Sequence, residues 1–157
     1  MLKDSGQRRE FESGAVRDMG AGKGRCDLMP LDVLSKLMTK RDDAYLDAVF
    51  YQHLNSFQSM GDVKYIYDLI LILLTEFDED TALLSVARQF ELGAEKYSDN
   101  NWRKGIPSHV YLDSAIRHYI KLRANWSDED HLGAVFWNLL CCIWTCENLP
   151  ELNTYHN

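Results

Sequence analysis

Apolar residues recur three and four positions apart from Pro30 to Pro150, and this spacing constrains the fold of the chain more than any other feature. It places apolar side chains on one face of a helix, whereas the alternation typical of a half-buried strand is not clear anywhere. We therefore predict an all-α fold, a bundle of about six helices. The largely apolar sets that define the helices are Leu31, Val33, Leu34 and Leu37; Tyr45, Leu46, Val49, Phe50 and His53; Val63, Ile66, Tyr67, Ile70 and Leu74; Leu83, Leu84, Ala87 and Phe90; Tyr111, Leu112, Ala115, Ile116, Tyr119 and Leu122; and Val135, Phe136, Leu139, Leu140 and Ile143.

Helix-start signals precede several of these sets. Pro30 suits the first turn of a helix, and the acids of residues 78–80 suit the positive end of a helix dipole. Ser108 can cap the fifth helix and Ser127 the sixth, where Ser127 and Asp130 resemble a capping box with Asp in place of Glu. We expect the sixth helix to begin after Ser127 and to stop near Pro150.

The length of 157 residues predicts a single domain, with an irregular glycine-rich segment over residues 1–29 and the helical bundle over residues 30–157. A net charge of −7 argues against binding a nucleic-acid backbone. No apolar leader precedes the first charges, and the run Leu69–Leu74 is too short to span a bilayer. We expect a cytoplasmic protein without nucleic-acid or membrane partners, in which that apolar run serves either the core or a contact between subunits.

Two acids one helical turn apart, Glu91 and Glu95, are the first candidate site. Residues four apart are neighbours on a helix, so two carboxylates there repel each other unless a cation lies between them. Mg²⁺ is such a cation, since it takes carboxylate oxygens and shares its shell with substrate phosphates. The alternative is a solvated helix face. Apolar neighbours predict that Glu91 is partly buried, which makes Glu91 the stronger metal-ligand candidate.

Two further groups of polar residues could complete the site. Asp113 is either a metal ligand or the partner of Arg117 in an ion pair within the helix, with Arg117 and His118 then facing phosphates. Asp128 and His131, three apart, are either capping residues or a second set of metal ligands.

Cationic and aromatic residues point to a nucleotide. Glycines alternating with Lys23 and Arg25 can bring amides and cations to phosphate oxygens, although the spacing is not that of a Walker loop. Trp102 can stack on a purine and Asn101 can bond a base edge, unless the tryptophan only covers the core. Histidine-aspartate phosphohydrolases are disfavoured, because none of the five histidines is followed by Asp.

Six ordered strings resemble the dATP/dGTP diphosphohydrolase domain of phages and bacteria, which is similar to the all-α MazG-like nucleotide pyrophosphohydrolases. Within that group the nearest resemblance is to the MazZ-type enzymes of phages that replace adenine with 2-aminoadenine. The chain departs from the MazG-like pattern in spacing its first acids Glu-x-x-x-Glu and in carrying residues 131–134 where Glu-x-x-Asp is expected. The strings are residues 13–18, 22–30, 90–97, 101–107, 111–118 and 137–141.

The resemblance implies cleavage of (d)GTP, or dATP, between the α- and β-phosphates, with dGMP feeding 2-aminoadenine nucleotide synthesis in a phage. It implies two or more Mg²⁺ ions, with Mn²⁺ as a substitute, and a homo-oligomer, either dimer or tetramer, in the host cytoplasm. The alternative is a helical nucleotide-binding or interaction module without catalysis. The predicted metal ligands are Glu91, Glu95, Asp113, Asp128 and His131, with Glu91 and Asp113 catalytic; the predicted substrate contacts are Lys23, Arg25, Lys96, Asn101, Trp102, Arg117 and His118.

Overall fold

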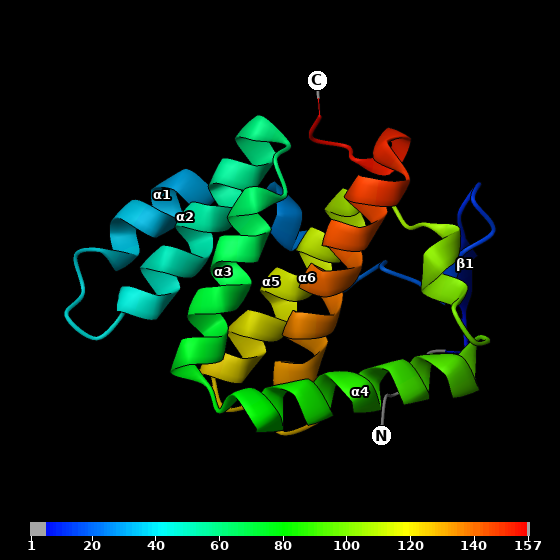
Figure 1. The fold of residues 1–157 in the computed structure, drawn as a ribbon. Coiled ribbons are helices and arrows are strands. Elements are labelled where there is room, and N and C mark those ends of the chain that lie inside the picture. The colour runs from blue at the N-terminus through cyan, green and yellow to red at the C-terminus, as the bar shows by residue number, and fades with distance from the viewer. Residues whose placement is uncertain (1–5, 157) are drawn as a thin grey trace.

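Six α-helices and one short hairpin make up the part of the chain described by the computed structural model, residues 6–156. The all-α prediction is confirmed. Figure 1 shows α5 and α6 side by side in the middle, α1, α2 and α3 on one side, and α4 lying crosswise beneath them. The helices are α1 Leu31–Met38, α2 Tyr45–Met60, α3 Lys64–Glu76, α4 Glu79–Lys96, α5 Ser108–Arg123 and α6 His131–Asn148, with 3₁₀ turns η1 Cys26–Leu28, η2 Asn101–Lys104 and η3 Pro150–Leu152.

The N-terminal segment is not wholly irregular, and in this respect the sequence prediction is wrong. β1 Arg8–Glu10 and β2 Val16–Asp18 pair antiparallel, with Arg9 opposite Arg17. Strands of three residues are too short to show an alternating pattern, which is why the sequence did not reveal them. The hairpin positions β2 beside the helices.

Helix starts follow the acids more closely than the serines. Asp78 caps α4 by accepting a hydrogen bond from the Thr81 amide, as the acidic cluster predicted. The predicted Ser127 cap of the last helix is wrong: α6 begins at His131, and Asp130 caps it by accepting from the Gly133 amide at 2.9 Å. Residues 127–130 therefore lie in the loop before α6 and are not part of the helix.

The core is built around α5 and α6, whose inward faces are almost wholly buried. Phe50 on α2 stacks on Tyr119 of α5 with ring centroids 3.7 Å apart, and the Tyr119 hydroxyl donates to Asp47. At the other side, α4 crosses α6 where Gly133 lies against the backbone of Ser85; a Cβ at Gly133 would approach the Ser85 carbonyl oxygen to 2.7 Å. This close crossing fixes α4 against the first turn of α6.

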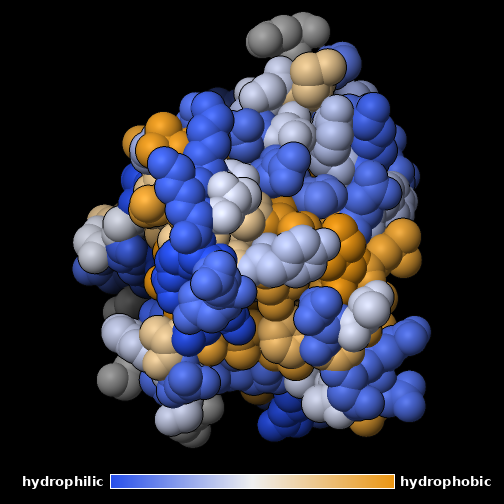
Figure 2. All heavy atoms as spheres, turned by 90° about the vertical axis from the view of Figure 1, so that its left-hand side faces the viewer, coloured by the Kyte–Doolittle hydropathy of each residue, from blue (hydrophilic) through white to orange (hydrophobic). Residues whose placement is uncertain are grey.

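The apolar run Leu69–Leu74 lies on α3, where Leu69, Ile70 and Leu73 are buried and Leu71 is 64% exposed. The run therefore serves mainly the core. Figure 2 views the molecule from the α1–α2 side and shows hydrophobic side chains gathered in the middle of that face, framed by hydrophilic ones. None of the described helices is both long and apolar enough to cross a membrane.

Candidate functional site

A cavity of about 610 Å³ opens between the N-terminal hairpin and α4, α5 and α6, a size typical of small-molecule sites. Its wall brings together β2 and the loop after it, the inner face of α4, η2, and one side of α5 and α6. The wall carries six lysines and arginines against four carboxylates, whereas the whole chain has a net charge of −7. Such a local excess of positive charge favours an anionic ligand. The charged lining residues are Arg9, Arg17, Lys23, Lys96, Arg117, Lys121, Asp18, Asp99, Asp113 and Glu129.

Arg17 of β2 is the most unusual cation of the wall, because its guanidinium has neutral partners. It donates to the Ser114 hydroxyl at 3.1 Å and to the Asn138 amide oxygen at 2.9 Å. The Tyr111 and Trp137 rings lie within cation–π distance of it. Its Nη1 atom is buried with no hydrogen-bond partner among the described residues. Burial lowers the pKa of Arg17, because removing the charged guanidinium from water is unfavourable. An anion bound in the cavity would stabilise this charge.

Asp18, next along β2, is surrounded by donors. Lys96 lies 2.7 Å from one carboxylate oxygen, while the Tyr97 hydroxyl and Arg8 bond the other at 3.0 and 3.2 Å. Burial and, after it, the negative charge of Asp18 raise the pKa of Tyr97 to about 12, so this hydroxyl stays protonated. The network attaches β2 to the end of α4 and holds Lys96 in the cavity wall.

Asp113 lies on α5 within the cavity wall, but both of its carboxylate oxygens are engaged. One accepts from the Cys26 amide at 2.6 Å and the other pairs with Arg117. Arg117 also donates to the carbonyl oxygens of Lys23 and Gly24. The geometry thus favours the ion-pair alternative for Asp113, because the pair holds the glycine-rich loop on α5 and keeps Lys23 at the cavity.

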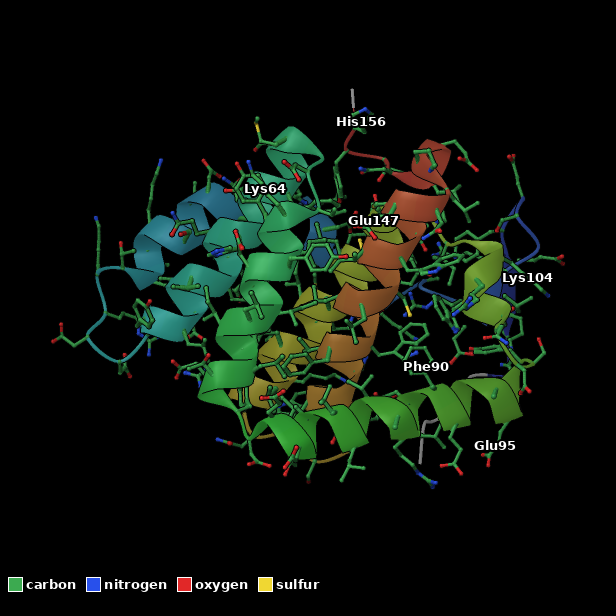
Figure 3. The ribbon with its side chains drawn as sticks, in the orientation of Figure 1. Lys64, Phe90, Glu95, Lys104, Glu147 and His156 are labelled. Atoms are coloured by element: carbon green, nitrogen blue, oxygen red, sulfur yellow. The ribbon has the colours of Figure 1, made fainter. Side chains whose placement is uncertain are left out.

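Arg25 of the same loop is placed elsewhere. Its guanidinium forms a bidentate pair with the buried Asp27 at 2.7 and 2.5 Å, outside the cavity lining. The aromatic part of the wall consists of Phe90, Trp102 and Trp137, and Phe90 lies 5.5 Å from Trp102 and 5.9 Å from Trp137 between ring centroids. Figure 3 shows Phe90 pointing from α4 into the space between α6 and η2.

Asn101 lies beside these rings in the lining, but its amide pairs twice with the backbone of Val16, at 3.1 and 2.9 Å. It therefore acts as a partner for β2. The Trp102 ring remains in the wall, where the sequence predicted a purine-stacking residue.

Three side chains of types that can bind a metal converge where α5 meets the start of α6. The Nδ1 atoms of His118 and His131 lie 3.0 Å apart, and Glu129 approaches His118 at 3.8 Å. Ligand atoms of all three lie within 4.8 Å of one another, and this His-Glu-His group could hold a metal ion. Asp128 accepts from the other nitrogen of the buried His131 at 2.8 Å. Burial, His131 and the nearby arginine Arg17 hold the pKa of His118 at about 3, so its imidazole is neutral.

Glu91 and Glu95 lie on the outer face of α4, away from this cluster. The prediction that Glu91 is partly buried is wrong, because its side chain is 54% exposed and pairs with Arg88. Glu95 is exposed, and Figure 3 shows it pointing away from the body of the molecule. Neither residue belongs to the cavity lining. The structure does not bring this pair to the other predicted ligands.

The structure therefore assembles part of the predicted site and adds to it. Arg17 and Glu129 were not among the predicted site residues, although Arg17 stands in one of the six strings and Glu129 in the acids before α6. His131 and Asp128 adjoin the cavity through His118 and Lys121, outside its lining. The predicted residues that line the cavity are Lys23, Lys96, Asn101, Trp102, Asp113, Arg117 and His118.

The comparisons with known proteins agree with the resemblance found in the sequence. The family model described as dATP/dGTP diphosphohydrolase, N-terminal, matches residues 55–154 of this chain. The chain belongs to this family. No curated protein and no solved structure matches it.

Proposed function

We propose that this chain is a nucleoside triphosphate diphosphohydrolase that converts (d)GTP, or dATP, to the monophosphate and pyrophosphate in the cavity between the hairpin and the helices. The family match supports a deoxynucleotide substrate, and the cation-rich wall supports a polyphosphate ligand. In the pathway that the sequence resemblance implies, dGMP would feed 2-aminoadenine nucleotide synthesis in a phage, and the enzyme would act in the cytoplasm as a dimer or tetramer.

The single observation that carries this proposal is Arg17. An arginine remains protonated in proteins, and here it donates to the neutral side chains of Ser114 and Asn138 at the wall of a cavity. Phosphate oxygens are the usual partners of a guanidinium in such a place. We assign Arg17 to the phosphate nearest the reacting bond.

The other cations of the wall would contact the remaining phosphates of the substrate. Lys23 lies on the glycine-rich loop, whose backbone Arg117 of α5 bonds through the Lys23 carbonyl oxygen. Lys121 lies one turn further along α5. Together they would neutralise the departing pyrophosphate, which is where negative charge grows in phosphoryl transfer. Trp102 and Phe90 offer an apolar wall on which a purine can stack.

A divalent cation fits one carboxylate of the cavity better than the others. Among the partly buried acids of the wall, the carboxylates of Asp18 and Asp113 accept hydrogen bonds, whereas the Glu129 carboxylate accepts none from the described residues. Divalent cations in phosphate chemistry are often held by one or two carboxylates together with substrate phosphates, so Glu129 and the triphosphate would hold the cation. Such an ion would supply charge neutralisation and a water of lowered pKa.

Product analysis tests the proposal. We expect dGTP or dATP, incubated with the protein and Mg²⁺ or Mn²⁺, to yield monophosphate and pyrophosphate by anion-exchange chromatography. In ¹⁸O-labelled water the label should enter the monophosphate, because the water attacks the α-phosphorus. Arg17→Met should lower kcat/KM about 100-fold or more, the size of effect seen when a phosphate-stabilising donor is removed.

The matched control is Arg41→Met, since Arg41 is exposed and pairs with Asp43 away from the cavity. It should retain the wild-type rate, and circular dichroism should show equal helix content in both variants. Nucleotide binding without turnover would contradict the proposal and support the alternative, a nucleotide-binding module without catalysis. Release of deoxynucleoside and triphosphate, or full activity in Arg17→Met, would contradict the proposal.

A further inference from the structure

We propose that His118, His131 and Glu129 form a resident site for one divalent transition-metal ion of the Mn²⁺ to Zn²⁺ series, which binds before the nucleotide and is not a Mg²⁺ site. The inference rests on the proposed function only for the claim that this ion serves the same reaction. Binding of the ion to the nucleotide-free protein follows from the side chains themselves.

The separation of the two imidazole nitrogens is the first step of the argument. Two nitrogens bound to one ion at roughly 2.1 Å lie about 3.0–3.4 Å apart, depending on whether the geometry is octahedral or tetrahedral. The Nδ1 atoms of His118 and His131 are 3.0 Å apart, where the two rings share a hydrogen bond that a bound ion would replace. The pair is thus spaced as two neighbouring ligands of a single ion.

Asp128 sets the chemistry of the buried histidine. Its carboxylate lies 2.8 Å from Nε2 of His131 and so holds the proton on that nitrogen. The Nδ1 lone pair of His131 is then directed toward His118. A carboxylate behind a metal-binding histidine is the usual way in which proteins orient the ring and strengthen the ligand. His118 needs only to carry its proton on Nε2 for both Nδ1 atoms to offer lone pairs.

Glu129 supplies the third ligand and the charge. It lies 3.8 Å from His118, is 19% exposed in its side chain, and its carboxylate accepts no hydrogen bond from the described residues. Because ligand atoms of the three side chains already lie within 4.8 Å of one another, a small rotation of Glu129 completes the triad at the edge of the cavity. Together Asp128 and Glu129 place two negative charges beside the ion, which counter the nearby cations of Lys121 and Arg117.

The donor set decides the class of metal. Two imidazoles and one carboxylate suit Zn²⁺, Mn²⁺ and their neighbours, whereas Mg²⁺ prefers oxygen ligands and keeps its waters. The cavity side of the triad leaves room for a substrate oxygen, as in metal sites with three protein ligands and one open position. The predicted metal role of His131 is kept by this assignment, whereas Asp128 becomes a positioning residue.

Cobalt titration of the nucleotide-free protein tests the site. Because Co²⁺ bound by imidazole absorbs visible light, we expect saturation at one Co²⁺ per chain, displacement by Zn²⁺, and no displacement by a thousandfold excess of Mg²⁺. Glu129→Gln and His118→Gln should weaken Co²⁺ binding by tenfold or more. Asp128→Asn should weaken it by about tenfold and alter the visible spectrum, which a merely structural residue would leave unchanged.

The matched control is Glu151→Gln, because Glu151 is an exposed acid of η3 outside the cavity. It should bind Co²⁺ as the wild type does. Absence of Co²⁺ and Zn²⁺ binding by the folded protein, equal competition by Mg²⁺, or unchanged binding in Glu129→Gln overturns the inference. Turnover of dGTP without Co²⁺ or Zn²⁺ binding would support the proposed function and overturn the metal site. Metal binding without turnover would support the metal site and contradict the proposed function.

Discussion

Two acidic regions of this molecule differ in what surrounds them. On the outer face of α4, Glu91 and Glu95 are exposed, and Glu91 pairs with Arg88 one turn away. At the junction of α5 and α6, Glu129 meets His118 and His131 at the edge of a cavity. The first region consists of neighbours along one helix, and the second of residues from two segments.

The difference teaches that a regular spacing of acids identifies neighbours but not a site. Residues four apart always lie close on a helix, so their proximity needs no ligand. Convergence of ligands from α5 and from the loop before α6 is restrained by packing, because His131 is almost wholly buried and Asp128 bonds its ring. Such restraint is what a metal site requires.

The largest effect expected from this comparison is on activity. Glu129→Gln should lower kcat for dGTP hydrolysis by about 100-fold, or about 2.7 kcal/mol of barrier, since it removes the charge of a mostly buried cavity carboxylate beside His118. Glu91→Gln should stay within about twofold of the wild type, because its side chain faces solvent. Steady-state rates of both variants, measured together, compare the two regions directly. The opposite ranking would return the metal site to the outer face of α4.

A smaller effect is expected on stability, where α4 crosses α6. Gly133→Ala would push a Cβ against the Ser85 carbonyl oxygen at 2.7 Å and should lower the free energy of unfolding by roughly 1–3 kcal/mol. Gly93→Ala is the control, because no atom lies within 4 Å of its Cβ and alanine raises helix propensity by up to about 1 kcal/mol. Urea denaturation followed by circular dichroism measures both. Equal stability of the two variants would show that the crossing does not restrain α4.

The smallest effect is expected at the ion pair on the outer face of α4. Arg88→Ala removes the partner of Glu91 and should cost less than about 0.5 kcal/mol in the free energy of unfolding, since both side chains are more than half exposed. The difference should vanish in 1 M salt, where exposed charges are screened within about 3 Å. A loss above 2 kcal/mol that persists in salt would mean that this face of α4 is covered in the native protein.

Much of the fold could be predicted from the sequence, because a 3.6-residue period is a local property. The apolar sets identified all six helices, and the acids at Asp78 marked the start of α4. Two features escaped. The hairpin is too short for a period, and the cap of α6 lies at Asp130 where Ser127 offered an equally good local signal. The residues near the start of α6 did not by themselves show whether Ser127 or Asp130 caps this helix.

For the candidate site, the sequence indicated some of the residues that line the cavity. Lys96 and Trp102 were expected as substrate contacts, and both line the cavity. Arg17 gave no such signal, because its importance comes from its partners. Among the residues that the structure describes, its guanidinium bonds the neutral side chains of Ser114 and Asn138, and a sequence does not show such contacts. Asp113 shows the converse, since its bonds to Arg117 and the Cys26 amide engage both of its oxygens.

By itself the sequence determined the helical class, the family to which the chain belongs and six of the polar residues that line the cavity. The tertiary structure decided which acids face inward. On α4 the core is contacted by Phe90, so Glu91 and Glu95 must face water. At the start of α6 the loop of residues 127–130 folds back on α5, and the packing of His131 brings Glu129 to His118. Burial of apolar surface, which depends on the whole chain, set both orientations.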